Sequence, residues 1–329
     1  MKKLLLVTCL CNWIVGIAPT MLASTNPAAQ QALTTAAQQA NFFRDQASSL
    51  QLDVDFVAQI KIPVRGHLTL KREASDRWWR KIVLGQFEQT EVRNRDTLYI
   101  QRNTPFTPAR VKELVSLLGF AEDSEGLHAK KLKQQVENGI ETTCLQVERE
   151  NVRGKSHELC INSATHEILS DDWLEAPDIR RSQQYSDYFD FGGHRFPRKL
   201  QLFMNGISVI TANVENLTKT PFDETLLVPP KDAIQRRQCA DLKHAVPVKT
   251  PDPMYPPSAS QSGMMGDTTV AMTILADGSV TNIQLAGSAT RSMDEVTLQT
   301  LKTWKFKPAM CGTEPVVSDI EVVVSFRLH

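Results

Sequence analysis

The chain has 329 residues, and its 37 basic side chains are matched by 37 acidic ones. A net charge of zero gives no electrostatic reason to expect a nucleic acid or an anionic membrane as partner. The length is sufficient for two domains.

The first 23 residues have the layout of a secretory signal peptide. Lys2 and Lys3 precede a 15-residue apolar run, and a polar stretch opens at Ser24, just after Ala23. A membrane-spanning helix needs roughly 20 apolar residues. The pattern therefore predicts a leader cleaved after Ala23 and export to the periplasm or cell envelope. An uncleaved inner-membrane anchor is the alternative, and a lipid anchor on a leader cysteine is less favoured.

Residues 24–240 are expected to form the first domain, which opens with a helix. Ala32, Ala36, Ala40 and Phe43 recur at helical spacing, which predicts a helix over about residues 27–49. From residue 51 the pattern alternates with period two, which indicates a series of strands.

Two local signals stand out within this domain. Thr107 is a candidate N-cap, with Pro108 at the first helical position and Gly119 as the stop signal, so a helix is expected between them. Asn205 and Gly206 separate two strand-like runs and predict a two-residue hairpin turn.

Four cysteines remain after removal of the leader, and an even number in an exported chain favours disulfides. The runs before and after residues 151–153 indicate a tight hairpin that places Cys144 opposite Cys160. Directly opposed strand residues have Cβ atoms about 4.5–5.5 Å apart, close to disulfide geometry. This predicts bridges Cys144–Cys160 and Cys239–Cys311. Zinc at Cys160 with a nearby histidine is disfavoured, and no metal or other cofactor is expected.

A leading helix, many antiparallel strands and one helical insertion indicate an α+β fold with one large curved sheet. Residues 197–230, with paired strands followed by a short segment ending in proline, resemble the closing strands of the half-barrel carriers of periplasmic lipoproteins (LolA-like). That resemblance implies a cavity for acyl chains on the concave face. The candidate lining residues are aromatic, although core filling is the favoured interpretation of strand aromatics: Phe56, Trp78 (or Trp79), Phe87, Tyr99 and Phe203.

A proline-rich passage over residues 241–260 predicts a linker, because proline lacks an amide donor and fixes φ. Residues 261–329 then read as strand, strand, helix, strand. Asp277 and Gly278 form the first turn, Ser292 and Glu295 a capping box, and Pro308 is expected to end the helix.

Several features of this C-terminal stretch occur in order over ~80 residues, and together they resemble the C-terminal domain of TonB. They are Pro253-x-Tyr255-Pro256, Asp277-Gly278-x-Val280, Ser288, Asp294, Trp304-x-Phe306-x-Pro308, Pro315-Val316 and a final strand ending Phe326-x-Leu328. The resemblance implies a small ββαβ domain that links inner-membrane energy to outer-membrane receptors.

In that family the last strand receives a receptor segment by strand addition. Carried onto this chain, the partner-binding residues are Tyr255, Pro256, Val322, Val323, Val324 and Phe326. Glu321 and Arg327 are candidates for guarding the strand edge against self-association. The cleavable leader and the folded first domain depart from the energy-transducing members.

No serine-hydrolase elbow, zinc-protease helix motif or phosphate-binding loop occurs in the chain, so no enzyme is expected. The sequence predicts a non-enzymatic envelope adaptor that binds an outer-membrane receptor or another envelope protein, with a link to TonB-dependent transport. A periplasmic lipid or lipoprotein carrier with a docking domain is the alternative. Co-purifying acyl chains would favour the carrier.

Overall fold

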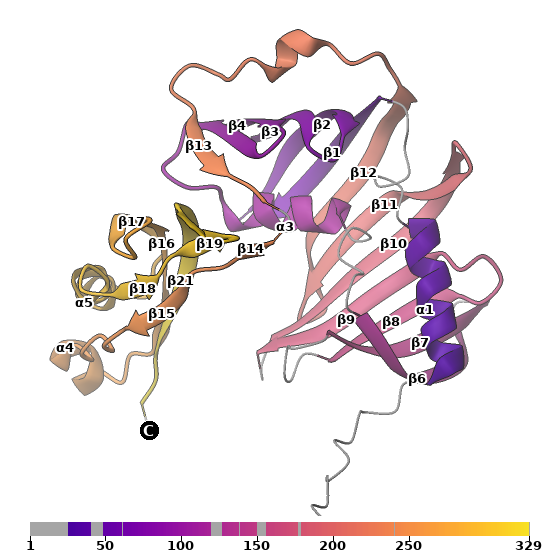
Figure 1. The fold of residues 1–329 in the computed structure, drawn as a ribbon. Coiled ribbons are helices and arrows are strands. Elements are labelled where there is room, and N and C mark those ends of the chain that lie inside the picture. The colour runs from indigo at the N-terminus through magenta and orange to yellow at the C-terminus, as the bar shows by residue number, and fades with distance from the viewer. Residues whose placement is uncertain are drawn as a thin grey trace, which may run out of the picture.

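The computed structural model describes residues 26–40, 49–60, 62–119, 127–137, 139–149, 156–176, 179–239 and 241–328. These residues form a large curved sheet with helices and a smaller domain beside it (Figure 1). The expected leader lies outside the described residues. None of the helices in the described part has the length and hydrophobicity needed to cross a membrane.

The large sheet is antiparallel throughout, with strand order β13-β5-β4-β3-β2-β1-β12-β11-β10-β9-β8-β7-β6. Because β13 and β6 lie at opposite ends of this order, the sheet is open. Its strands are β1 (Leu50–Gln59), β2 (Pro63–Ala74), β3 (Arg77–Leu84), β4 (Phe87–Asn94), β5 (Thr97–Arg102), β6 (Leu127–Glu137), β7 (Ile140–Arg149), β8 (Ser156–Asn162), β9 (Ile168–Ala176), β10 (Ile179–Phe191), β11 (His194–Met204), β12 (Ile207–Lys219) and β13 (Ile234–Arg237).

We call the domain built on this sheet the half-barrel. Its hydrophobic core lies on one face of the sheet. Along β1, Leu52, Val54 and Phe56 alternate with more exposed residues, because successive strand side chains point to opposite faces. Two helices, α1 (Pro27–Ala40) and α3 (Ala109–Leu118), pack their apolar stripes onto this inner face. In Figure 1, α3 lies across the hollow of the sheet and α1 lies near β6. The short 3-10 helix η1 (Glu224–Leu227) contacts β3 and β4.

The first-domain turn signals are confirmed, and one helix start is corrected. Asn205 and Gly206 form the β11–β12 turn with φ values of 49° and 79°. Gly119 caps α3, as expected. Thr107 is not the N-cap, because its hydroxyl donates to Gln89 Oε1 at 2.6 Å, and Pro108 occupies the cap position. The helix expected to continue past Ala40 runs into residues outside the description.

The C-terminal domain has a three-stranded sheet of order β17-β16-β21 and two small sheets, β14-β19-β20 and β15-β18. Its elements are β14 (Leu242–Lys243), β15 (Val246–Lys249), α4 (Pro257–Gln261), β16 (Gly266–Ile274), β17 (Val280–Gly287), α5 (Arg291–Leu301), β18 (Lys305–Lys307), β19 (Ala309–Cys311), β20 (Glu314–Val316) and β21 (Ser318–Phe326).

Helix α5 covers one face of the β17-β16-β21 sheet. Val270, Met272 and Ile274 of β16 point toward it and form a core with Leu301, Trp304 and Phe306. The turn between β16 and β17 depends on glycine. Gly278 has a φ of 79°, and a Cβ there would lie 1.9 Å from the carbonyl oxygen of Phe306.

The structure corrects two expectations for this domain. Helix α5 ends at Leu301, well before Pro308, because Phe306 enters β18 and its N–H donates to the Gly278 carbonyl at 3.0 Å. Its N-cap is Thr290, whose hydroxyl accepts from the Met293 N–H.

Residues 241–260 are not a free linker. Strand β15 pairs with β18 despite Pro247, which is tolerated because β15 has only one neighbour among the described strands. Ala259 of α4 is buried against Met293 and Phe326. The indole N–H of Trp304 donates to the Pro251 carbonyl at 3.0 Å. The C-terminal domain therefore begins before residue 251.

Candidate functional site

Strand β21 is an edge strand of its sheet. It pairs with β16 over the whole length from Ser318 to Phe326, and β16 lies between β21 and β17. The nine residues contain neither proline nor glycine. Within the described part of the chain, one side of this strand thus leaves its N–H and C=O groups without a strand partner, which is the feature that strand addition requires.

The side chains of β21 alternate between two environments. Val322 and Val324 point toward α5 and pack on the core, and Phe326 is 3 % exposed. Val323 points to the opposite face and is 58 % exposed. Four β21 residues were predicted to bind the partner. Only the side chain of Val323 is exposed to a partner, and the side chains of the other three pack toward the domain core.

Tyr255 and Pro256 lie at the far end of the same strand. The Tyr255 ring packs edge-to-face on Phe326 with ring centroids 5.4 Å apart, and its hydroxyl donates to the Met264 carbonyl. Pro256 is buried. These residues brace the end of β21, so a Tyr255→Ala change would remove packing as well as a surface group.

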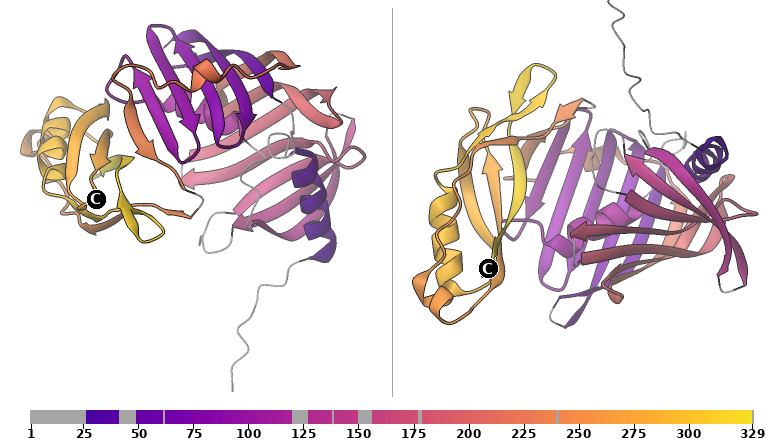
Figure 2. Two further views of the ribbon diagram at one scale, coloured as in Figure 1. Left: turned by 45° about the horizontal axis from the view of Figure 1, so that its top comes forward. Right: turned by 90° about the horizontal axis from the view of Figure 1, so that it is seen from below.

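The sheet face opposite α5 is fastened to the half-barrel. Asp319 of β21 accepts from Arg236 of β13 in two contacts of 3.0 and 2.9 Å, and from the Thr273 hydroxyl at 2.7 Å. Glu321 lies 2.7 Å from the ammonium of Lys112 on α3. Figure 2 shows the C-terminal domain beside the β5 and β13 end of the large sheet.

Two further contacts hold the same junction, and both expected edge guards are paired. Arg237 forms an ion pair with Glu314, and Arg102 lies close enough to Asp319 to influence it electrostatically. Glu321 pairs with Lys112, and Arg327 pairs with Asp267 of the neighbouring strand. Both charges are paired within the chain, and their role as guards of the edge stays a prediction.

The electrostatics of Asp319 follow from this position. Burial by itself raises the pKa of the Asp319 carboxyl, but hydrogen bonds from Arg236 and Thr273 and the charges of Arg236 and Arg102 outweigh it. The pKa therefore lies below the usual value of 3.8. The ionised carboxylate is the form that holds the two domains together.

Protonation of Asp319 is expected to loosen the domain junction. Because the folded-state pKa is depressed, the contribution is complete above pH 3.8 and is lost as the pH falls through the lower folded value. Asp319→Asn should mimic this loss at neutral pH, at a cost of about 1 kcal/mol for a partly exposed ion pair. Small-angle scattering should show a larger radius of gyration for Asp319→Asn than for the control Asp252→Asn. Identical scattering from both variants would contradict the role of Asp319.

Both predicted disulfides are present. Cys144 lies directly opposite Cys160 in the β7–β8 pair, and the two are bonded. Cys239 is bonded to Cys311, which ties the segment after β13 to β19. Among the described residues no cluster of three or more metal-ligand side chains occurs.

The aromatic residues proposed to line a cavity do not share one face. Phe56 and Phe87 lie on the inner face and are buried in the core. By strand register, Trp78 shares that face with Ile82, beneath the Arg80 guanidinium, which lies 4.8 Å from its ring. Tyr99 and Phe203 follow or precede inward-facing residues and therefore point outward. The prediction that Tyr99 and Phe203 line an inner cavity is wrong, because the alternation of side chains along a strand decides which face a residue occupies, whatever its type.

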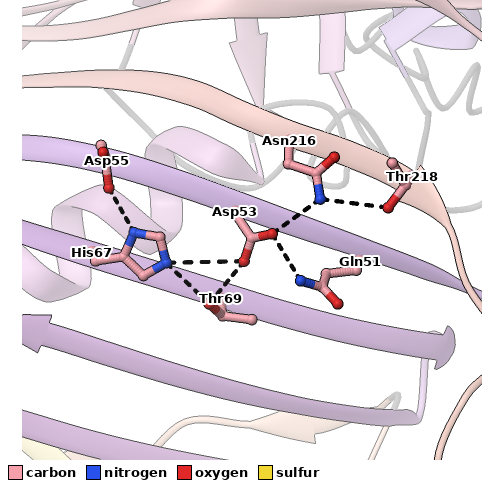
Figure 3. A network of polar contacts seen from close by, with 7 residues as sticks. All are labelled: Gln51, Asp53, Asp55, His67, Thr69, Asn216 and Thr218. Atoms are coloured by element: carbon pink, nitrogen blue, oxygen red, sulfur yellow. Dashed lines mark hydrogen bonds and ion pairs between the residues drawn. The ribbon is translucent and has the colours of Figure 1, made fainter.

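A polar network crosses the outer face of the half-barrel (Figure 3). Asp53 accepts from Gln51 at 2.8 Å, Thr69 at 2.8 Å and Asn216 at 3.1 Å, and His67 Nδ1 lies 2.6 Å from Asp55. The Thr69 hydroxyl donates its proton to Asp53. It therefore cannot donate the same proton to His67, as a nucleophile activated by that histidine would. The network joins β1, β2 and β12 at the bulge after Asp53, which is a structural role.

The C-terminal domain matches known proteins. Residues 251–328 match the family model described as Gram-negative bacterial TonB protein C-terminal. Curated relatives named Protein TonB, from two strains of Xanthomonas campestris pv. campestris, are 24% identical over 108 residues, which is 32% of this chain and 48% of theirs. The chain spans about half the length of the curated relatives it matches. The sequence-based recognition of a TonB-like C-terminal domain is confirmed.

Solved structures resemble each part of the chain. The solution NMR structure of the Pseudomonas aeruginosa TonB C-terminal domain is 29% identical and covers 27% of this chain and 88% of its own, with a TM-score of 0.24. A LolA superfamily protein from Nitrosomonas europaea is 10% identical and covers 60% of this chain and 97% of its own, with a TM-score of 0.42.

Proposed function

We propose that this protein is a non-enzymatic adaptor of the cell envelope that captures an extended segment of another envelope protein on β21. The observation that carries the proposal is the open side of β21 in a TonB-like domain. Main-chain hydrogen bonds to an added strand supply affinity without a preformed pocket. An outer-membrane receptor is the partner class that the TonB likeness favours, with TonB-dependent transport as the process.

The half-barrel has a consequence for this proposal. It is joined to the TonB-like domain by a disulfide and by three ion pairs from β13 and α3, so it is not a loosely tethered neighbour. An adaptor of this form presents its binding strand from a fixed position on a larger body. The half-barrel could then serve a second function, such as binding another envelope component.

A carrier of lipid or lipoprotein is the second candidate. It is favoured by the apolar inner face of the curved sheet, on which α1 and α3 lie. Phe56 and Phe87 are already packed in that core, so a lipid would have to displace α1 or α3. Organic extraction of the purified protein followed by mass spectrometry separates the two candidates, because only the carrier retains acyl chains.

Proline substitution at one of two neighbouring positions of β21 should weaken partner binding at least tenfold. Successive residues of an edge strand direct their N–H groups alternately to the paired neighbour and outward. Of Val322→Pro and Val323→Pro, one therefore removes an outward donor and leaves the pairing with β16 in place. That variant should stay folded and bind at least tenfold more weakly.

The binding probe is a set of heptapeptides selected from a random phage-displayed library on the full chain. Affinity is measured by fluorescence anisotropy and folding by circular dichroism, with Val323→Thr as the control that keeps a β-branched side chain and the donor. If the folded proline variant binds the selected peptides as tightly as the parent, the partner does not add to β21.

A further inference from the structure

Three isoleucines are exposed at one end of the half-barrel. Ile60 and Ile62 belong to the turn between β1 and β2, where the Ile60 N–H donates to the Ile62 carbonyl at 3.4 Å. Ile207 opens β12 directly after the Asn205-Gly206 turn. The three side chains are 56 %, 70 % and 66 % exposed. Turns are normally built from glycine, proline, asparagine, aspartate and serine, so large aliphatic side chains left in water at two turns suggest a function.

The strand register places these two turns side by side. Strands β1 and β12 are neighbours, and the last pair of their ladder joins Ala58 to Ile210. Ile60 lies two residues beyond Ala58 on one strand. Ile207 lies three residues before Ile210 on the other, so both segments extend past this pair toward the same end of the sheet. Because adjacent strands are about 5 Å apart, the three isoleucines form one apolar surface, which we call the isoleucine rim.

The main-chain groups at this end are paired within the chain. The Asn205 N–H donates to the Arg180 carbonyl, and the Asn205 Oδ1 accepts from the Arg180 N–H, both at 2.8 Å. The Gly85 N–H donates to the Arg65 carbonyl at 3.2 Å. Hairpin turns close the ends of strands and do not expose an edge to which another strand could pair. A partner at this end would therefore contact side chains.

Basic side chains flank the isoleucine rim. The two segments that form it, residues 60–65 and 204–208, contain two basic residues, Lys61 and Arg65, and no acidic one. Arg65 is exposed, and no residue in the described part of the chain forms an ion pair with it. On the next hairpin, the side chain of Arg180 is 63 % exposed, and its partner strand carries Leu174, which is 59 % exposed. The rim therefore combines apolar side chains with an excess of positive charge.

A hollow of about 480 Å³ lies on the outer face of the sheet directly behind the β1–β2 turn. Its lining includes the cation of Arg65, the polar side chains of Thr211 and Asn213, and two valines. The carboxylate of Asp55, which also lines the hollow, lies 2.6 Å from Nδ1 of His67. Guanidinium groups bind phosphate oxygens in a bidentate manner, so the hollow suits a phosphate beside an apolar surface.

We propose that the isoleucine rim docks the half-barrel on a phospholipid surface. Ile60, Ile62 and Ile207 enter the bilayer at the boundary between headgroups and acyl chains, and Arg65 binds a headgroup phosphate. Contiguous exposed apolar side chains mark a site for a membrane or a protein. A lipid surface fits better, because side chains that project from hairpin turns need no complementary pocket in a fluid bilayer, and the basic flank favours anionic headgroups. This docking is separate from strand addition on β21 and does not rest on it.

The test places a polarity-sensitive nitrobenzoxadiazole dye at the rim of the full chain. The dye is attached to the thiol of Ile207→Cys or, as control, of Val136→Cys. Val136 is 68 % exposed beside the β6–β7 turn, which the strand register places at the opposite end of the sheet. Vesicles of phosphatidylglycerol and phosphatidylethanolamine should raise the emission of the dye at position 207, and spin-labelled acyl chains should quench it. The dye at position 136 should not respond. Each dye reports its own surroundings, so membrane binding by another part of the chain cannot imitate this result.

Two variants, read by the dye at position 207, test the side chains themselves. Ile60→Ser/Ile62→Ser should bind the vesicles about tenfold more weakly, because two aliphatic side chains no longer enter the bilayer. Arg65→Gln should bind them about fivefold more weakly through the loss of one cation near the anionic surface. Lys302→Gln, which removes an exposed charge of the C-terminal domain, should bind like the parent.

Three results would overturn the proposal. The dye at position 207 would not respond to these vesicles, or Ile60→Ser/Ile62→Ser would bind them as tightly as the parent. In the third, the dye would respond to an extract of envelope proteins and not to vesicles, which would assign the rim to a protein partner. Equal binding by Arg65→Gln and the parent would overturn the assignment of Arg65 to the headgroup.

Discussion

Removal of the Cys239–Cys311 bridge is expected to destabilise the C-terminal domain by about 4 kcal/mol. The bridge joins residues 72 positions apart. In the chain-entropy model, a cross-link stabilises the folded state by restricting the unfolded chain, and the effect grows with the logarithm of the loop length. The C-terminal domain from β14 to β19 lies inside this loop and β20 and β21 lie outside it, so unfolding of this domain is the transition that should respond.

The second bridge provides a matched control. Cys144–Cys160 joins residues 16 positions apart, for which the same model gives about 3 kcal/mol, and it lies in the half-barrel. Cys239→Ala/Cys311→Ala should therefore shift the unfolding of the C-terminal domain, and Cys144→Ala/Cys160→Ala that of the half-barrel. Urea denaturation followed by hydrogen exchange of each domain measures both. Equal unfolding midpoints for the parent and Cys239→Ala/Cys311→Ala would show that the bridge does not constrain the chain.

The bridge also bears on the domain junction. Cys239 lies two residues after Arg237, and Cys311 lies three before Glu314, so the disulfide sits beside the Arg237–Glu314 ion pair. The pairing of Leu242 with Cys311 continues the same contact. A covalent tether at this point keeps the effective concentration of the ionic contacts high, so they need not be strong individually.

Local sequence patterns predicted those features that a few adjacent residues determine. Asn205-Gly206 and Asp277-Gly278 formed the expected turns, because left-handed backbone is tolerated there. The hairpin register that placed Cys144 opposite Cys160 was also readable, because alternation and a short loop fix it. In each case the determining residues lie within about twenty positions of one another.

The features that sequence did not predict depend on distant parts of the chain. Arg236 meets Asp319 across 83 positions, and Lys112 meets Glu321 across 209. Nothing in the neighbourhood of either charge distinguishes it from an ordinary surface residue. The end of α5 was missed for a related reason: Trp304 continues the helical spacing of Leu301, but the close contact of Phe306 with Gly278 draws the chain into β18.

The candidate site was predicted in outline. The sequence identified the last strand, and the structure places it at a sheet edge. Val322, Val323, Val324, Phe326, Tyr255 and Pro256 remain predictions as partner-binding residues. The docked face could not be anticipated, because a β-strand pattern says which residues share a face and not what covers that face.

Asp294 shows how a residue of the TonB-like pattern stabilises the domain. It lies in the first turn of α5 and is 6 % exposed. Its carboxylate accepts from the Thr268 hydroxyl at 2.8 Å, the Ser288 hydroxyl at 2.5 Å and the Ala289 N–H at 3.1 Å. These contacts join β16, the end of β17 and the start of α5. A carboxylate near a helix N-terminus is also favoured by the helix dipole.

Asp294→Ala is expected to destabilise the C-terminal domain by about 3 kcal/mol, because it leaves three donors without their acceptor, one of them the fully buried hydroxyl of Thr268. Asp294→Asn keeps the size and one acceptor oxygen, so its cost should be about 1 kcal/mol. The adjacent Glu295 forms an exposed pair with Arg291. Glu295→Ala should therefore change the free energy of unfolding by less than about 0.5 kcal/mol. Urea denaturation of the three variants gives the comparison, and a loss for Asp294→Ala no larger than that for Glu295→Ala would show that the buried carboxylate does not hold the helix to the sheet.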